Sequence, residues 1–233
     1  MTRFLDFIAL LGLALLTSFL SGTDQIGLLI NPRYEILVSF GSACLIMGAL
    51  WTLFRGKSIR RDRSHVTSAI LILFVLVFST QIPLRSLSSE TALNRGVESR
   101  VPTIDELKFT EALNTPSKER TLTEWVRILT QHPDPRIFFG QKVVLEGMVA
   151  KLPSLPENTL MLSRFVVACC IADARPLALL VTVPNTEEWE NSDWIRVSGT
   201  IESGEFEGKQ RGFVSAENIQ IIDEPKNPYE YEY

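Results

Sequence analysis

The sequence predicts a chain in two parts: an α-helical transmembrane region of three helices, followed by an all-β domain that one short helix precedes. Three apolar runs near the N-terminus and a basic loop between the last two predict the first part. A change of the apolar period to two in the C-terminal half predicts the second part, because such alternation is typical of half-buried strands.

The three apolar runs are each long enough to cross a bilayer. They span about residues 4–20, 36–54 and 66–84, and the last two contain no charged side chain. A helix needs about 20 apolar residues to cross the hydrocarbon core. Residues 1–85 are therefore expected to form a transmembrane region that has the lipid bilayer as its surroundings.

The distribution of basic residues predicts the orientation. The loop Arg55–Arg63 carries five basic residues, whereas the connection Ser21–Glu35 carries one. Because basic loops stay in the cytoplasm, we expect a multi-pass protein of the plasma (inner) membrane with a cytoplasmic N-terminus and an extracytoplasmic C-terminal domain. An alternative remains open for the first run, since Arg3 and the small residues of Ser18–Gly22 resemble a cleavable signal peptide. Cleavage would leave the C-terminal domain on the same side.

The charge differs between the two parts. Residues 1–85 have a net charge of +4 and the remainder has a net charge of −8, which gives −4 for the chain. Nucleic-acid binding requires a basic face, so the acidic C-terminal part argues against a nucleic-acid partner.

A polar stalk is expected at residues 86–119, before an extracytoplasmic domain at residues 120–233. The domain begins with a capping-box spacing, in which Thr121 and Glu124 satisfy each other's backbone N–H groups. This pattern predicts a short amphipathic helix that ends before Pro133.

Five runs after this helix are expected to be strands. They are Lys142–Ala150, Leu160–Cys170, Leu177–Val183, Trp194–Ile201 and Phe213–Ile222. The first and fourth contain central glycines, Gly147 and Gly199, which permit the bend of a small closed barrel. Five short strands of this kind resemble the OB-like (oligonucleotide/oligosaccharide-binding) five-stranded barrel, a fold that by itself implies no ligand.

Two adjacent cysteines, Cys169 and Cys170, are the candidate functional residues, and three interpretations remain open. On a regular strand their side chains would point to opposite faces, and they would be core residues. If the strand ended near Cys170, both sulfurs could turn toward Asp173, and zinc or another soft metal ion would suit this set, with a distant His132 as a further ligand. In an oxidising compartment they could instead form a vicinal disulfide.

The order of these features resembles a bacterial family of unassigned activity, described as subunits of a two-component membrane permease complex. The resemblance rests on Pro83–Gly96, on Arg164–Asp173 with its R-F-V-x-x-C-C-x-A-D pattern, and on Pro225–Tyr231. It implies a multispanning membrane permease as the partner, and it supplies no catalytic residue.

The function expected from the sequence is that of an integral membrane accessory subunit that is not an enzyme. Its extracytoplasmic domain would dock on or gate a transporter, with metal ions as one candidate cargo. The spans lack ionisable groups apart from Asp6, whereas a conducting path normally needs polar lining. Two alternatives remain: a membrane-anchored thiol-redox or metal-dependent enzyme that uses Cys169 and Cys170, and an envelope scaffold that binds only protein.

Overall fold

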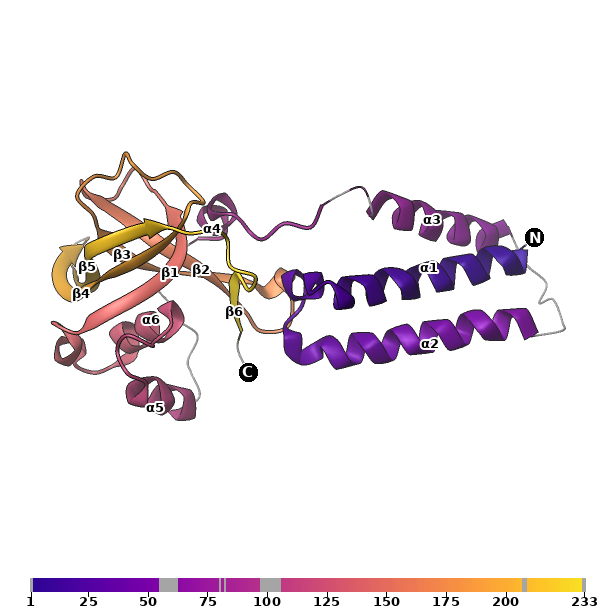
Figure 1. The fold of residues 1–233 in the computed structure, drawn as a ribbon, viewed down its shortest axis with the longest axis horizontal. Coiled ribbons are helices and arrows are strands. Elements are labelled where there is room, and N and C mark those ends of the chain that lie inside the picture. Colours follow the sequence, from indigo (N-terminus) through magenta and orange to yellow (C-terminus); the bar gives the residue numbers. More distant parts are fainter. Residues whose placement is uncertain are drawn as a thin grey trace. The chain divides into compact units, whose positions relative to one another are not determined.

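The computed structural model describes residues 2–54, 63–79, 81, 83–96, 106–206 and 209–231. They form two compact units. The first comprises Met1–Arg85 together with Cys169–Ala172, and the second comprises Ser86–Ala168 and Asp173–Glu232. Figure 1 labels the helices and strands of both.

Three helices form most of the first unit. They are α1 (Thr2–Gly22), α2 (Glu35–Phe54) and α3 (Arg63–Ser79), with the short 3-10 helices η1 (Gln25–Leu28) and η2 (Pro32–Tyr34) between the first two. The helix α1 packs against both α2 and α3. A hydrogen bond of 2.7 Å joins the hydroxyls of Thr17 and Ser42, and the Ser21 hydroxyl donates to Glu35 Oε1 at 2.6 Å. These polar contacts lie between α1 and α2.

Two helices in the described residues are long and apolar enough to cross a membrane, over Phe4–Gly22 and Pro32–Phe54. Their large apolar side chains are exposed, with Phe40 at 70% and Trp51 at 65%. A helix in the core of a soluble domain would bury such side chains. Length, composition and exposure are therefore compatible with a membrane anchor.

The prediction of a third span over residues 66–84 is not supported at that length. The helix α3 ends at Ser79, and its apolar stretch over described residues is Ile70–Ser79. The sequence after it is polar as far as Gln81, and Pro83 cannot continue a helical hydrogen-bond ladder. The basic segment 55–62, which predicted the orientation, lies outside the described residues.

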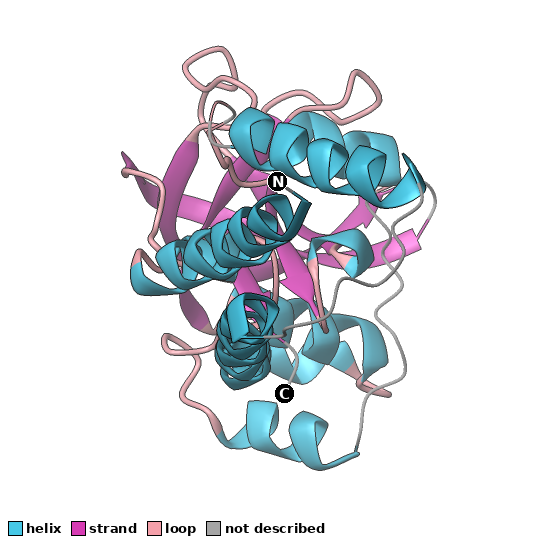
Figure 2. Cartoon of the chain, turned by 90° about the vertical axis from the view of Figure 1, so that its right-hand side faces the viewer, coloured by secondary structure: helices cyan, strands magenta, loops and turns pink. Residues whose placement is uncertain are grey.

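A closed five-stranded barrel forms the centre of the second unit. Its strands are β1 (Lys142–Ala150), β2 (Thr159–Val167), β3 (Arg175–Thr182), β4 (Trp194–Phe206) and β5 (Lys209–Ile221). The strand β1 pairs with both β2 and β4, β2 pairs with β3, and β5 pairs with β3 and β4. Of these five pairings between described strands, the β3–β5 pairing alone is parallel. Figure 2 shows these strands in magenta.

A sixth strand, β6 (Tyr229–Tyr231), pairs in parallel with β2 outside this ring. It brings the end of the described chain onto the barrel. Tyr229 is buried, and its hydroxyl accepts the N–H of Leu87 at 3.0 Å. Burial raises the pKa of the Tyr229 hydroxyl above its ordinary value.

The helix α6 (Leu122–Gln131) carries the predicted capping box, which is confirmed: Thr121 and Glu124 bond to each other's backbone N–H groups. Trp125 and Ile128 are fully buried in the same core as the barrel strands. Two other helices, α4 (Ser89–Arg95) and α5 (Glu106–Asn114), fall within the predicted stalk. The helix α4 packs against β1, β2 and β3, and α5 packs against α6. The described part of residues 86–119 thus belongs to the barrel unit.

Gly199 lies at a β-bulge, where the register of β4 against β5 shifts. A Cβ atom at this position would lie 2.1 Å from the Ser215 carbonyl oxygen. Because this oxygen belongs to the backbone, no rotamer change of Ser215 could make room for a side chain at position 199.

We expect Gly199→Ala to destabilise the barrel by about 1–3 kcal/mol, the usual range for overpacking. Ser203→Ala, at an exposed position of the same strand, serves as the control and should change stability by less than about 0.5 kcal/mol. Chemical denaturation followed by Trp fluorescence measures both. Equal midpoints for Gly199→Ala and the wild type would contradict the close approach at the bulge.

Candidate functional site

The two cysteines lie in the connection between β2 and β3. We call Ala168–Ala174 the cysteine loop; it contains the 3-10 helix η4 (Ile171–Asp173). The prediction that the second strand runs to Cys170 is wrong, because β2 ends at Val167. Its neighbour β3 begins at Arg175, which is opposite Val166, so the pairing of β2 with β3 ends before the cysteines. They are therefore free of the side-chain alternation of a strand.

The three candidate ligands lie close together. The Sγ atoms of Cys169 and Cys170 are 3.6 Å apart, and these atoms and a carboxylate oxygen of Asp173 all lie within 4.8 Å of one another. Cys169 is exposed, and Cys170 and Asp173 are half-buried. The two sulfurs are not joined in a disulfide, since their separation far exceeds the S–S bond length of about 2.0 Å.

Two sets of hydrogen bonds hold the loop. Asp173 Oδ1 accepts the N–H of Ala168 at 2.9 Å, which ties the end of the loop to its beginning. Within the first unit, the Asn31 N–H donates to the Cys169 carbonyl at 2.9 Å, and the Ile171 N–H donates to the Leu29 carbonyl at 2.8 Å. The backbone on both sides of Cys170 is thus fixed by hydrogen bonds.

The spacing of the sulfurs suits one metal ion. In tetrahedral coordination with zinc–sulfur bonds of about 2.3 Å, two thiolates lie about 3.8 Å apart. The observed separation of 3.6 Å is within a few tenths of that value. Thiolate ligands favour zinc and softer ions, and a carboxylate oxygen is an accepted third ligand of zinc. Cys169, Cys170 and Asp173 could therefore hold such an ion with small side-chain movements.

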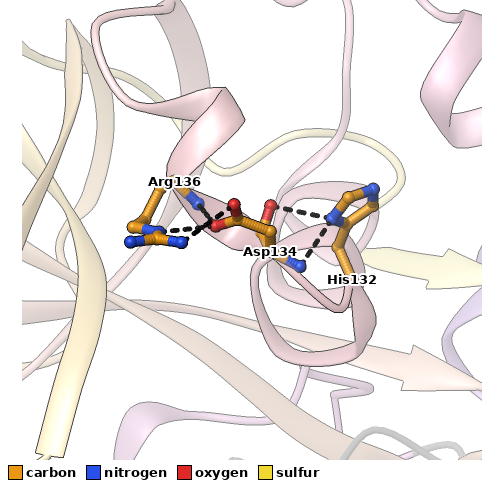
Figure 3. Close-up of polar contacts among 3 residues, drawn as sticks. All are labelled: His132, Asp134 and Arg136. Atoms are coloured by element: carbon orange, nitrogen blue, oxygen red, sulfur yellow. Dashed lines mark hydrogen bonds and ion pairs between the residues drawn. The ribbon is translucent and has the colours of Figure 1, made fainter.

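His132, named as a distant ligand, makes other contacts (Figure 3). Its Nδ1 accepts the N–H of Asp134 at 3.1 Å. Its ring packs edge-on against Phe138 and is stacked near Phe109. It does not belong to the Cys169, Cys170 and Asp173 group found among the described residues. His132 is therefore a residue of the turn after α6.

Arg164, the other charged residue that flanks the cysteines, contacts the segment near the end of the described chain. Its guanidinium donates to the carbonyls of Asn227 and Pro228 and lies 3.9 Å from Glu230. Arg164 thus holds the segment that leads into β6. Cys44, the third cysteine, is in α2.

Arg95 Nη1 donates to the Ala174 carbonyl at 2.7 Å, a contact that no local pattern in the sequence predicts. The two residues are 79 positions apart. The only sequence signal was indirect: Arg95 and the cysteines belong to two of the motifs that carry the family resemblance.

Comparison with known proteins identifies the second unit. Residues 103–232, more than half of the chain, match the family model described as the DUF1980 C-terminal domain. The chain belongs to the DUF1980 family. The cysteine loop lies inside the DUF1980 match.

The chain is also similar to the UPF0703 protein YcgQ of Bacillus subtilis, with 27% identity over 99 residues. The alignment covers 42% of this chain and 35% of YcgQ, so the chain spans about a third of that relative's length. These matches support the resemblance to a bacterial family. The permease-subunit part of the resemblance stays a proposal.

The turn in Figure 3 gives a test of the local electrostatics. The side chain of Arg136 bonds to both carboxylate oxygens of Asp134, and its N–H bonds to one. The hydrogen bond from the Arg136 side chain has the largest effect on the pKa of Asp134, and the bond from the Arg136 backbone has the next largest. Both hold this pKa below its ordinary value. A lowered carboxyl pKa in the folded state stabilises the fold above the unfolded-state pKa. That contribution is lost as the pH falls through the folded-state pKa.

We therefore expect Arg136→Ala to raise the pKa of Asp134 toward its ordinary value, measured by NMR titration of the carboxyl. Glu217 is the internal control, because its lowered pKa comes mainly from Lys142 and should not move. An unchanged Asp134 titration would show that Arg136 does not set it.

Proposed function

We propose that the chain is an integral membrane accessory subunit of a permease complex, and that it binds zinc or a similar soft metal ion at the cysteine loop. The observation that carries the metal part is the grouping of two thiols and one carboxylate within 4.8 Å, with the sulfurs 3.6 Å apart. Two further features support the membrane part, namely the two exposed apolar helices and the separate barrel unit.

The barrel supports a role as a presenting domain. Its ring order, β1-β2-β3-β5-β4, supports the OB-like barrel expected from the sequence. The net charge of −8 after residue 85 favours cations over nucleic acid. The fold alone names no ligand, so the cysteine loop, and not the barrel, suggests the cargo.

The transporting pathway would belong to a partner, a multispanning membrane permease. The charged residues in the sequences of α1 and α2 are Arg3, Asp6 and Glu35, all near helix ends. A pathway for ions needs polar lining within the membrane. The chain would therefore present or gate the ion at the outer mouth of its partner, and it would not act as an enzyme.

Zinc content tests the metal-binding part. The full-length protein, purified in detergent and loaded with Zn²⁺, should retain about one ion per chain after desalting, because two thiolates and a carboxylate form a binding set. Cys169→Ser/Cys170→Ser should retain less than about a tenth of that. Cys44→Ser is the matched control and should retain the full amount. Equal zinc contents in the wild type and the double variant would contradict the proposal. That result would favour the alternative function, an envelope scaffold that binds only protein.

Thiol labelling tests the orientation. Cys169 is exposed, so a membrane-impermeant maleimide added to spheroplasts should label the wild type if the barrel is extracytoplasmic. Cys169→Ser/Cys170→Ser should lose the label, because Cys44 would be shielded within the bilayer. Labelling only after the membrane is lysed would place the barrel in the cytoplasm and contradict the orientation.

One observation favours a second candidate, a membrane-anchored thiol-redox protein. Cys169 is an exposed thiol whose sulfur is close to that of Cys170. A vicinal disulfide would close an eight-membered ring and exclude a metal ion. Mass spectrometry distinguishes the redox function from metal binding, if the protein is taken directly from an oxidising compartment and alkylated before digestion. A loss of two hydrogens on the peptide with both cysteines would favour the redox function.

A further inference from the structure

The helix α4 carries Arg95 to the cysteine loop, and its attachment to the second unit is built from buried residues. Ser89 and Ala92 are fully buried. The Ser89 N–H donates to the Ser192 hydroxyl at 3.1 Å, and the two hydroxyls are 2.9 Å apart. Ser192 has a φ of 75°, a backbone conformation that persists where surrounding contacts require it. The position of α4 is therefore fixed on the barrel unit.

The helix ends directly after Arg95. Gly96 has a φ of 77°, in the region that favours glycine and commonly ends helices. Arg95 is thus the last helical residue, and its Nη1 donates to the Ala174 carbonyl at 2.7 Å. Ala174 is 4% exposed, and a hydrogen bond from a charged donor to such a carbonyl is among the stronger ones.

This contact and the one made by Asp173 hold the two ends of the loop. The Asp173 carboxylate accepts the N–H of Ala168, and the residue after Asp173 is held by Arg95. The direction of Asp173 relative to the two sulfurs depends on both. Loss of the Arg95 contact would remove one of the hydrogen bonds that hold the backbone next to Asp173.

We propose that Arg95 is a positioning residue for the metal ion. It keeps the Asp173 carboxylate beside the Cys169 and Cys170 sulfurs, and it supplies a positive charge at the loop. The inference rests on the metal-binding function proposed above. A divalent ion with two thiolates and one carboxylate has a net charge of −1, and a guanidinium at the same loop stabilises that anionic complex. Groups that orient metal ligands in this way typically change metal affinity by about 10–100-fold when they are removed.

Competition between the full-length protein and a chromophoric zinc chelator, in nanodiscs, tests the proposal. Arg95→Ala should weaken the Zn²⁺ Kd by about 10–100-fold. Arg95→Gln keeps a hydrogen-bond donor without the charge, so it should weaken the Kd less than Arg95→Ala does. The difference between the two variants separates the contribution of the hydrogen bond from that of the charge. Arg136→Ala removes a cation from the same unit outside the loop, and it should leave the Kd unchanged. The unfolding temperature of each metal-free variant is measured in parallel.

The outcomes are distinct. A wild-type chain that binds zinc, with Arg95→Ala and Arg95→Gln binding equally well, would overturn the role of Arg95 alone. A lower unfolding temperature with an unchanged Kd would show a purely structural role and would also overturn it. If Arg95→Ala fails to fold, a weakened Kd in folded Arg95→Gln supports the proposal and an unchanged one overturns it. A wild-type chain that binds no zinc would overturn the proposed function and the role of Arg95 together.

Discussion

In a β-strand, neighbouring side chains point to opposite faces, so two adjacent cysteines on a strand cannot bind one ion. The end of β2 at Val167 removes this constraint. Because β3 starts opposite Val166, the next residues leave the strand and turn through η4. Both sulfurs and the Asp173 carboxylate then lie within 4.8 Å of one another. The metal-binding proposal depends on this change of backbone geometry more than on the presence of the cysteines.

The loop itself is short, and contacts within it and from distant parts of the sequence hold its conformation. The Asp173 carboxylate accepts the N–H of Ala168, and the Arg95 guanidinium donates to the Ala174 carbonyl. Arg95 belongs to a helix whose buried Ser89 is hydrogen-bonded to Ser192. Such supporting contacts give a metal site its geometry as much as the ligands do. They also explain why a motif of adjacent cysteines, rather than the C-x-x-C spacing of a zinc knuckle, can present two thiols on one side.

The sequence alone predicted most of the barrel and less of the site. The strand Lys142–Ala150 has the predicted bounds, and the capping box of α6 is confirmed, because both follow from local patterns. The third span is not supported at its predicted length, since apolar composition does not show that α3 ends at Ser79. The parallel β3–β5 pairing, β6 and the Arg95 contact with Ala174 were not predicted. Each joins residues far apart in the sequence, for which no local pattern exists.

We propose that both adjacent thiolates bind one ion. X-ray absorption at the zinc edge, on the zinc-loaded full-length protein, measures this most directly. We expect two sulfur ligands at about 2.3 Å, with oxygen or nitrogen ligands at about 2.0–2.2 Å completing the shell. A shell without sulfur, or with a single sulfur, would contradict the claim that Cys169 and Cys170 act together.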